Sequence, residues 1–257
     1  WISFTLLNGV WTPDGDVNDR LEQTGTGWKL TQRSGAVETY NTNGQLIEVR
    51  NPAGLTQALN YDTNGRLTTV ISPTGHTLTL AYNSNNLLSS VTDPNGQANI
   101  YTYDVSRRLT RVSRPDNTAR IYHYENANYP SFLTGISLDD GQGNVRRLST
   151  YAYDGVGNAI STEHSGGAEK FTFTYNSASQ TTVTDAGGTS EVMTFAVTQG
   201  VKNLVNKVMP DGKTLNQTFD ANNNLTCRKD EEERVTTYTY NTANQRTSMT
   251  EGQGGTC

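Results

Sequence analysis

Tyr61-Asp62-Thr63-Asn64-Gly65-Arg66-Leu67 is the stretch of sequence to which this chain keeps returning. Each copy begins with an aromatic residue, here called the anchor, and the remaining anchors are Tyr40, Tyr82, Tyr103, Tyr124, Tyr153, Tyr175, Phe195, Phe219 and Tyr240. The first five anchors are 21 residues apart, and the later steps are 29, 22, 20, 24 and 21 residues. A fixed period in this range predicts a repeat architecture, in which each repeat packs against its neighbours.

The residues that lead into each anchor alternate in character. Leu59-Asn60-Tyr61 and Leu80-Ala81-Tyr82 place large apolar side chains two apart with a small one between them. Two copies depart from this rule, with Glu38 and Gln217 at the first place. A period of two, carried by Tyr, Phe and Thr, predicts a β-strand with one apolar face.

Two turns are expected in each repeat. The fourth position after the anchor holds a residue that tolerates positive φ in seven copies, namely Gly44, Gly65, Asn86, Asn128, Gly157, Asn223 and Asn244. This position predicts a β-hairpin loop, although Arg107, Ser179 and Gln199 depart from it. The second turn follows at Pro52-Ala53-Gly54, Pro73-Thr74-Gly75, Pro94-Asn95-Gly96 and Pro115-Asp116-Asn117, where proline suits the first corner and glycine the second.

The segment between the two turns breaks simple alternation. Leu67 and Val70 are three residues apart and would lie on opposite faces of a flat strand. A bulge or a strong twist is therefore expected there. The fold class that follows is all-β: an antiparallel β-ribbon of tandem repeats with a period of about 21 residues, about twenty strands in all, and a ladder of aromatic anchors on one face.

Composition limits the classes of fold and partner. Hydrophobic residues make up 33% of the 257 residues and mean hydropathy is −0.64, so a thick core is not expected. The net charge of −5 gives no general attraction to nucleic acid. No apolar run reaches about 18 residues, so no membrane span is expected. Two cysteines are too few for a disulfide scaffold.

The domain layout follows from the repeats. Residues 1–27 are expected to form a cap of lead-in strands, with Trp11 and Trp28 covering the exposed end of the ladder. Residues 28–257 are expected to form an array of about ten repeats, with an insertion near residues 126–144. The insertion either forms a loop, carrying Tyr129 and Phe132, or lengthens two strands. Because the chain starts at Trp1 without a methionine or a signal peptide, it is expected to be part of a larger protein.

Two segments are candidate binding sites. The segment from Asp14 to Asp19 resembles a calcium loop, but Asp19 and Gly25 stand where that loop needs glycine and glutamate, so an ordinary polar turn is favoured. The arginine cluster (Arg107, Arg108, Arg111, Arg114 and Arg120) has the charge to hold an acidic glycan. Strand alternation would divide these arginines between two faces, and a solvated face is favoured.

No constellation of catalytic residues is found. His76, His123 and His164 lack ligands at metal spacing, so no metal site, cofactor site or catalytic residue is predicted. The aspartates that follow the anchors, Asp62, Asp104, Asp154 and Asp220, are interpreted as turn residues. The acidic run from Asp230 to Glu233 is interpreted as a solvated hairpin tip.

The frame Tyr-Asp-x-x-Gly-Arg-Leu followed by Pro-x-Gly, as in residues 61–75, closely resembles the Rhs/YD-repeat family over residues 28–252. That family includes bacterial Rhs toxins, the B and C components of insecticidal toxin complexes, and teneurins. The resemblance implies a β-ribbon that winds into a hollow shell, commonly around a C-terminal toxin domain. An aspartate-dependent self-cleavage site closes the shell in related toxins, and no match to it is found here.

The resemblance implies a non-catalytic section of shell wall in a secreted or exported, cell-surface associated bacterial protein. Its expected partners are the C-terminal toxin domain and the remaining shell repeats of the same polypeptide. Two alternatives stay open: a carbohydrate-binding module and a cell-surface adhesion module of teneurin type. Unpaired strands at the ends of such a ribbon also predict self-association.

Overall fold

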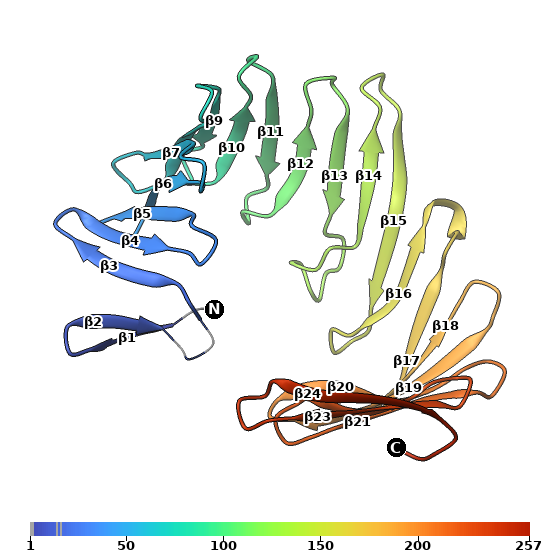
Figure 1. The fold of residues 1–257 in the computed structure, drawn as a ribbon. Helices are drawn as coiled ribbons and strands as arrows, with labels where there is room; N and C mark the ends of the chain where they lie inside the picture. Colours follow the sequence, from blue (N-terminus) through green and yellow to red (C-terminus); the bar gives the residue numbers. More distant parts are fainter. Residues whose placement is uncertain (1–2, 14, 16) are drawn as a thin grey trace. The chain divides into compact units, whose positions relative to one another are not determined.

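The computed structural model describes residues 3–13, 15 and 17–257. In these residues there are 24 β-strands and one short 3₁₀ turn at Ser165–Gly167, so the all-β prediction is confirmed. The chain divides into two compact units, one reaching Ile121 and including Asp139–Gly143, the other comprising Tyr122–Leu138 and Asn144–Cys257. Within each unit, strands that follow one another in the chain lie side by side, as the labels in Figure 1 show.

The strands of the first unit are β1 (Phe4–Leu7), β2 (Val10–Pro13), β3 (Arg20–Thr24), β4 (Gly27–Thr31), β5 (Val37–Asn41), β6 (Leu46–Arg50), β7 (Thr56–Tyr61), β8 (Leu67–Ile71), β9 (Thr77–Tyr82), β10 (Leu88–Thr92), β11 (Ala98–Tyr103), β12 (Leu109–Ser113) and the start of β13 (Ala119–His123). Each pairs antiparallel with the next, from Leu6↔Trp11 to Ser113↔Ala119.

The strands of the second unit are the end of β13, β14 (Gly135–Asp139) except its last residue, β15 (Val145–Tyr153), β16 (Ala159–His164), β17 (Phe171–Ser177), β18 (Gln180–Thr184), β19 (Ser190–Thr198), β20 (Val201–Val208), β21 (Thr214–Phe219), β22 (Leu225–Lys229), β23 (Arg234–Tyr240) and β24 (Arg246–Gln253). From β15 to β24 the same antiparallel order holds.

Both kinds of turn have the same backbone geometry. In the first turn, Gly65 N donates to Asp62 O at 3.0 Å and Asp62 N donates to Arg66 O at 2.9 Å. In the second, Gly54 N donates to Asn51 O at 2.9 Å and Asn51 N to Leu55 O at 3.0 Å. Gly54 therefore lies one place after the second corner, not at it. Its φ of 83° closes the hairpin as a left-handed residue after a type I turn.

The expected positive φ is confirmed at six of the seven predicted positions, which are Gly44, Gly65, Asn86, Gly157, Asn223 and Asn244. It is wrong at Asn128, which lies in a different turn, where Phe132 N donates to Tyr129 O at 2.9 Å. Arg107 adopts a φ of 66° without being a residue that favours it. The same pair of backbone hydrogen bonds closes its turn, so the hairpin imposes the conformation.

A β-bulge explains the spacing of Leu67 and Val70. Asn60 pairs with Thr69 and Tyr61 pairs with Leu67, so Thr68 is an extra residue in β8. The bulge brings Leu67 and Val70 to the face that carries Leu59 and Tyr61. The same register shift follows the anchors of most other repeats, as at Thr102/Tyr103 and Thr239/Tyr240. The expected bulge is confirmed, and we call the face that carries the anchors the aromatic face.

The sheet has almost no core. Of the described hydrophobic residues only Val37, Ala119 and Cys227 are buried, and no large side chain is completely enclosed. The accessible surface is 15947 Å², against roughly 11,000 Å² for a compact protein of 28.1 kDa. Each unit is therefore a single layer of strands, in agreement with the low hydrophobic content.

The two predicted boundary features have definite structures. Trp11 and Trp28 meet edge to face with ring centres 5.3 Å apart, beside strands that pair directly with the first repeat. The assignment of residues 1–27 as a separate cap remains a prediction. The repeat with the insertion is longer than the others in two places. Tyr124 and Leu133 are nine positions apart, against six for Tyr61 and Leu67. The strand that follows, β15, is also longer than most strands. The bounds of the insertion remain a prediction.

Candidate functional site: the joint between repeats

The aspartate of the motif organises the first turn. Asp62 Oδ1 accepts hydrogen bonds from Asn64 N and Arg66 N, both at 2.9 Å, and Asp62 Oδ2 accepts one from Arg66 Nε at 2.7 Å. These bonds, first of all from the backbone and side chain of Arg66, lower the pKa of Asp62. Carboxylates with lowered pKa occupy the same place at Asp104, Asp154 and Asp220. Their prediction as turn residues agrees with the geometry.

The anchor tyrosine joins one repeat to the one before it. Tyr61 Oη donates to Leu46 O at 2.8 Å, fifteen residues earlier, and Tyr82 Oη donates to Leu67 O at 2.9 Å. The same bond to the preceding repeat is made by Tyr153 to Leu133 O, by Tyr175 to Ala159 O and by Tyr240 to Leu225 O. Except at Leu133, which lies outside the strands, the accepting carbonyl belongs to the residue that pairs with the preceding anchor beside the bulge.

The residue that precedes the accepting residue in the sequence contacts the next repeat through its side chain. Arg66 Nη1 donates to Asn86 Oδ1 at 2.7 Å, and its guanidinium lies 4.7 Å from the centre of the Tyr82 ring. Arg66 is held at the same time by Asp62 of its own turn. One side chain therefore fixes a turn, covers the next anchor and contacts the next turn.

Other repeats make this contact with different chemistry. Gln45 Nε2 donates to Gly65 O at 3.0 Å, Asn203 Nδ2 to Asn223 Oδ1 at 2.8 Å, and Asn224 Nδ2 to Asn244 Oδ1 at 3.1 Å. In the repeat with the insertion, Phe132 takes the place of Arg66, and its ring lies 4.9 Å from that of Tyr153. We call the hydroxyl bond and this forward contact together the repeat joint.

The predicted arginine cluster is not one site. Arg108 pairs with Asp104 at 2.6 Å and Arg111 with Asp139 at 2.7 Å. Arg111 lies opposite Ile121 and Arg120 lies opposite Val112, so Arg111 and Arg120 point to different faces of the sheet. The division between faces expected from strand alternation is present. Glycan binding by this cluster remains a prediction, and no contact described above favours it.

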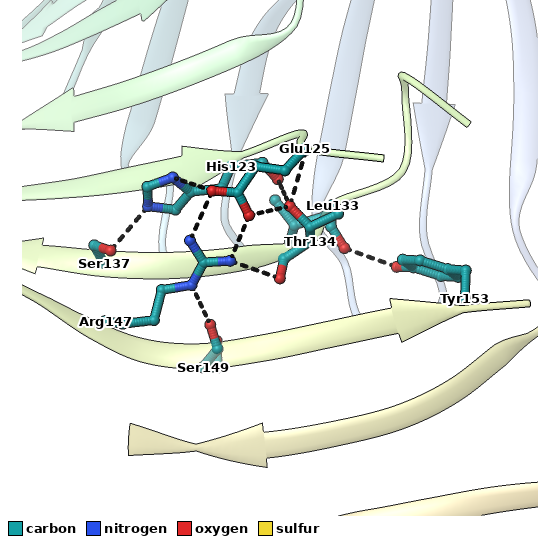
Figure 2. A network of polar contacts seen from close by, with 8 residues as sticks. All are labelled: His123, Glu125, Leu133, Thr134, Ser137, Arg147, Ser149 and Tyr153. Atoms are coloured by element: carbon teal, nitrogen blue, oxygen red, sulfur yellow. Dashed lines mark hydrogen bonds and ion pairs between the residues drawn. The ribbon is translucent and has the colours of Figure 1, made fainter. Parts of the chain in front are cut away.

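A polar network connects β13, β14 and β15 of the second unit (Figure 2). Arg147 pairs with both carboxylate oxygens of Glu125, at 3.2 and 3.0 Å, and donates to Thr134 O at 2.8 Å. The hydrogen bond from Arg147 lowers the pKa of Glu125. On the other side, His123 Nε2 lies 2.8 Å from Ser137 Oγ. Burial, followed by the nearby charge of Arg147, lowers the pKa of His123.

Ser137, His123 and Glu125 thus meet in the order of a hydrolytic triad, and the geometry argues against that use. Ser137 is 3% exposed, so a substrate does not reach its hydroxyl. His123 Nδ1 is 3.6 Å from Glu125 Oε1, beyond a hydrogen bond, and the carboxylate is already held by Arg147. The network satisfies polar groups at the long turn of the insertion.

The remaining candidate residues lie apart from one another. His76 Nδ1 contacts Thr74 Oγ1 at 2.7 Å, and His164 Nε2 lies 3.4 Å from Glu169 Oε2. Among the described residues no group of three metal-binding side chains occurs. Of the calcium-like segment, Asp14 and Asp16 lie outside the described residues, while Asp19 Oδ1 accepts a hydrogen bond from Arg33 N at 2.9 Å.

The acidic run forms a turn of the usual kind. Glu233 has a φ of 65°, and Asp230 N donates to Arg234 O at 3.0 Å, so the predicted hairpin tip has the expected geometry. Asp230 itself is 5% exposed and not solvated. Burial alone would raise the pKa of Asp230, but hydrogen bonds from the side chain and backbone of Arg234 lower it.

A disulfide between Cys227 in β22 and Cys257 was not foreseen. Thr256 and Cys257 lie with Asn216 and Thr218 around a shallow pocket, so the last residues cross back over neighbouring strands. Cysteine number argues only against a disulfide scaffold, and one bridge does not make one. The repeat joint was also missed. Its only signal in the sequence is a leucine six residues after the anchor in five repeats, at Leu46, Leu67, Leu88, Leu109 and Leu225.

No helix in the described part of the chain is long and apolar enough to cross a membrane.

Comparison with known proteins agrees with the repeat geometry. The family model described as Teneurin YD-shell matches residues 26–189, and the RHS Repeat model matches residues 203–256. No curated protein matches. Similar solved structures include the crystal structure of TcdB2-TccC3-Cdc42, with a TM-score of 0.57 and 11% identity over 91% of this chain, and a Photorhabdus luminescens Tc holotoxin pore, with 0.59 and 11% over 91%. The match covers 16% and 15% of those longer chains. Since the YD-shell model matches more than half of its residues, the chain belongs to the teneurin YD-shell family of Rhs/YD-repeat proteins.

Proposed function

We propose that this chain is a non-catalytic section of an Rhs-type β-shell, which encloses a C-terminal toxin or effector domain within a larger polymorphic toxin. The observation that carries the proposal is the repeat joint. It ties each hairpin to the next through contacts about 15 and 20 residues apart, as in Tyr61 to Leu46 and Arg66 to Asn86. A wall can be lengthened by such joints without any enclosed core.

The single layer supports the same function. A wall needs strands that pair without interruption. Each unit has a single layer of strands, so anything that covers either face belongs to another part of the parent protein or to another molecule. The hairpins are joined by tight turns, and stacked repeats resist local opening, so a protease finds few loops to enter. The parent protein is expected to act outside the producing cell, and the disulfide fits an oxidising compartment.

Deleting whole repeats from the parent protein tests enclosure. Removing residues 55–96 joins Gly54 to Gln97 and keeps the second-turn pattern, because 42 residues are two periods. The shell should open, and the C-terminal domain should become digestible by added protease or toxic to its producer. Intact parent protein should protect that domain and show no activity. Protection that is unchanged by the deletion, or absent from the intact parent, would overturn the proposal.

A further inference from the structure

Four asparagines of this chain precede glycine, namely Asn8, Asn43, Asn64 and Asn95. Such a pair is chemically labile, because the nitrogen of a glycine, which carries no side chain, can reach and attack the side-chain amide carbon of the asparagine before it. All four asparagines are exposed to water. Exposure therefore does not decide which of them reacts, and the backbone of each turn does.

In three of the four turns the attacking nitrogen is engaged. The glycine nitrogen donates a hydrogen bond at 3.0 Å to the carbonyl three residues earlier, and the acceptors are Asn41 O, Asp62 O and Asp93 O. The nitrogen of the asparagine is also held in each of these turns, as in the bond from Asn64 N to Asp62 Oδ1 at 2.9 Å. The turn has to open before the glycine nitrogen can attack.

The β1–β2 hairpin is closed in a different way. Leu7 pairs with Val10, so Asn8 and Gly9 form the whole loop, with φ values of 49° and 80°. Two successive residues at positive φ are typical of the type I′ turn that Asn-Gly favours. Among the described residues Gly9 N has no acceptor, in contrast to the glycine nitrogens of the other three turns. No backbone hydrogen bond therefore has to break before Gly9 N reacts.

We propose that Asn8 is a site of spontaneous deamidation in the folded protein, and that their turns protect the other three asparagines. Gly9 N loses its proton to hydroxide and attacks Cγ of Asn8. A five-membered succinimide forms, and the side-chain nitrogen takes a proton from water and leaves as ammonia. Water then opens the ring at either carbonyl, which gives aspartate or isoaspartate. The reaction needs water and hydroxide alone.

Isoaspartate at position 8 changes the backbone as well as the charge. It adds the Cβ atom to the main chain, and a loop of two residues has no spare length to accommodate it, so the pairing of Leu7 with Val10 should be lost. Aspartate at the same place adds only a negative charge. The isoaspartyl carboxylate is the chemical group that isoaspartyl methyltransferases, which use S-adenosylmethionine, modify. Asn8 thus becomes a mark of the age of the molecule, whatever the function of the parent protein.

The test compares the four sites within one protein. The 257-residue protein is incubated at mildly alkaline pH and sampled over time, and tryptic peptides are analysed by mass spectrometry. The four asparagines fall in different peptides, because Arg20, Arg50 and Arg66 separate them. Asn8 should deamidate about three- to tenfold faster than each of the others, which must first break a turn hydrogen bond. In denaturing urea the four rates should converge.

Gln199 is the matched control within the chain. Gln199 and Gly200 form the same kind of loop between the paired Thr198 and Val201, with φ values of 49° and 79°. A glutamine would have to close a six-membered ring, which forms far more slowly, so Gln199 should stay unmodified. Reaction at Gln199 as fast as at Asn8 would overturn the proposal.

Two variants separate the lengthened backbone from the added charge. Asn8→Gln should abolish methyl transfer at position 8 by an isoaspartyl methyltransferase. Asn8→Asp should keep the amide hydrogen exchange of β1 and β2 unchanged, whereas aged protein that carries isoaspartate should exchange faster there. If Asn8 reacts no faster than Asn64 in the folded protein, the proposal is wrong. It is also wrong if Asn8 remains the fastest site in urea, because the neighbouring sequence and not the turn would then determine the rate.

Discussion

Tyrosine in this chain acts through its hydroxyl as well as its ring. An anchor ring covers apolar surface on the aromatic face, as leucine or phenylalanine would. Its hydroxyl, however, donates to the carbonyl of the residue that pairs with the preceding anchor, at Leu46, Leu67 and Leu225. An unpaired carbonyl in a half-buried position destabilises the fold, so the hydroxyl contributes beyond the area that the ring covers.

Tyr61→Phe should lower the free energy of unfolding by about 0.5–1.5 kcal/mol, because it deletes the bond to Leu46 O and leaves the ring in place. Tyr101→Phe is the control. Tyr101 lies on the same face two residues before an anchor, and no hydrogen bond of its hydroxyl is among the contacts described. Urea denaturation of the two variants should separate them. Equal midpoints would mean that the anchor hydroxyl contributes nothing to the joint.

Gly65→Val should cost on the order of 1–3 kcal/mol, because a β-branched residue would have to adopt a φ of 78°. Gly65→Asn should cost less, since Asn86 holds a φ of 59° at the same place. Asn64→Ala should cost least, because Asn64 is exposed. Thermal melts of the three variants should follow this order, and a valine variant as stable as the alanine variant would contradict the turn geometry.

His123 should make stability depend on pH. Its folded-state pKa lies below the unfolded value of about 6.5, so the folded state favours the neutral ring. The stability that this contributes is present above pH 6.5 and is lost as pH falls through the lower folded pKa. His123→Gln should flatten the pH dependence of the melting temperature in that window. His76→Gln is the control, because His76 is exposed and lies outside this network, and equal slopes for both variants would contradict the assignment.

At the scale of the strand and turn, the periodicity of the sequence is sufficient to predict most of the fold. The alternation before each anchor predicts the first strand, and glycine or asparagine at the fourth position predicts the turn. Arg107 shows where such reasoning stops: a hairpin closed by two backbone hydrogen bonds can impose positive φ on a residue that disfavours it. The position of a turn is determined by how its hairpin is closed. The preference of single residues for positive φ indicates that position in most repeats, but not in all of them.

The repeat joint and the disulfide are harder to predict, for different physical reasons. A joint partner is 15 to 20 residues away and changes type between Gln45, Arg66 and Phe132, so no single residue marks it. It becomes visible only in the structure, where the register of the strands brings the accepting carbonyl within reach of the next anchor. The disulfide depends on the path of the last residues across the sheet, and nothing periodic describes that path.

Cys257→Ser should destabilise the last repeats. The Cys227–Cys257 bridge closes a loop across 30 positions, and in the chain-entropy model a loop of this size contributes about 3–4 kcal/mol. The effect should be local, because each repeat contacts only its neighbours. Hydrogen exchange should therefore speed up in β22 to β24 and stay unchanged in β5 to β12. Treatment of the unsubstituted protein with a dithiol reductant should reproduce the result, and a uniform increase along the chain would contradict it.

At the scale of the whole chain, stability is a sum over repeats and joints. A single layer with three buried hydrophobic side chains among those described has no central core on which distant parts all depend. The consequence is that the chain should tolerate the loss of whole repeats better than the loss of part of one. This separates a repeat array from a globular domain of the same length.

Deletion of residues 55–96 should therefore leave a folded protein. β6 would meet β11 in place of β7, and Tyr103 would offer its hydroxyl to Leu46 O as Tyr61 does now, because 42 residues are two full periods. The protein should unfold in one transition with a smaller dependence on denaturant, in proportion to the surface removed. Deletion of residues 55–65 is the control. It removes only β7 and its turn, and so places β8, which has no anchor, beside Leu46. The smaller deletion should be the more damaging one. Circular dichroism and urea denaturation compare the folding and stability of the two deletion variants. If the variant without residues 55–65 is as stable as the variant without residues 55–96, strand pairing alone, without the repeat joint, holds the array together.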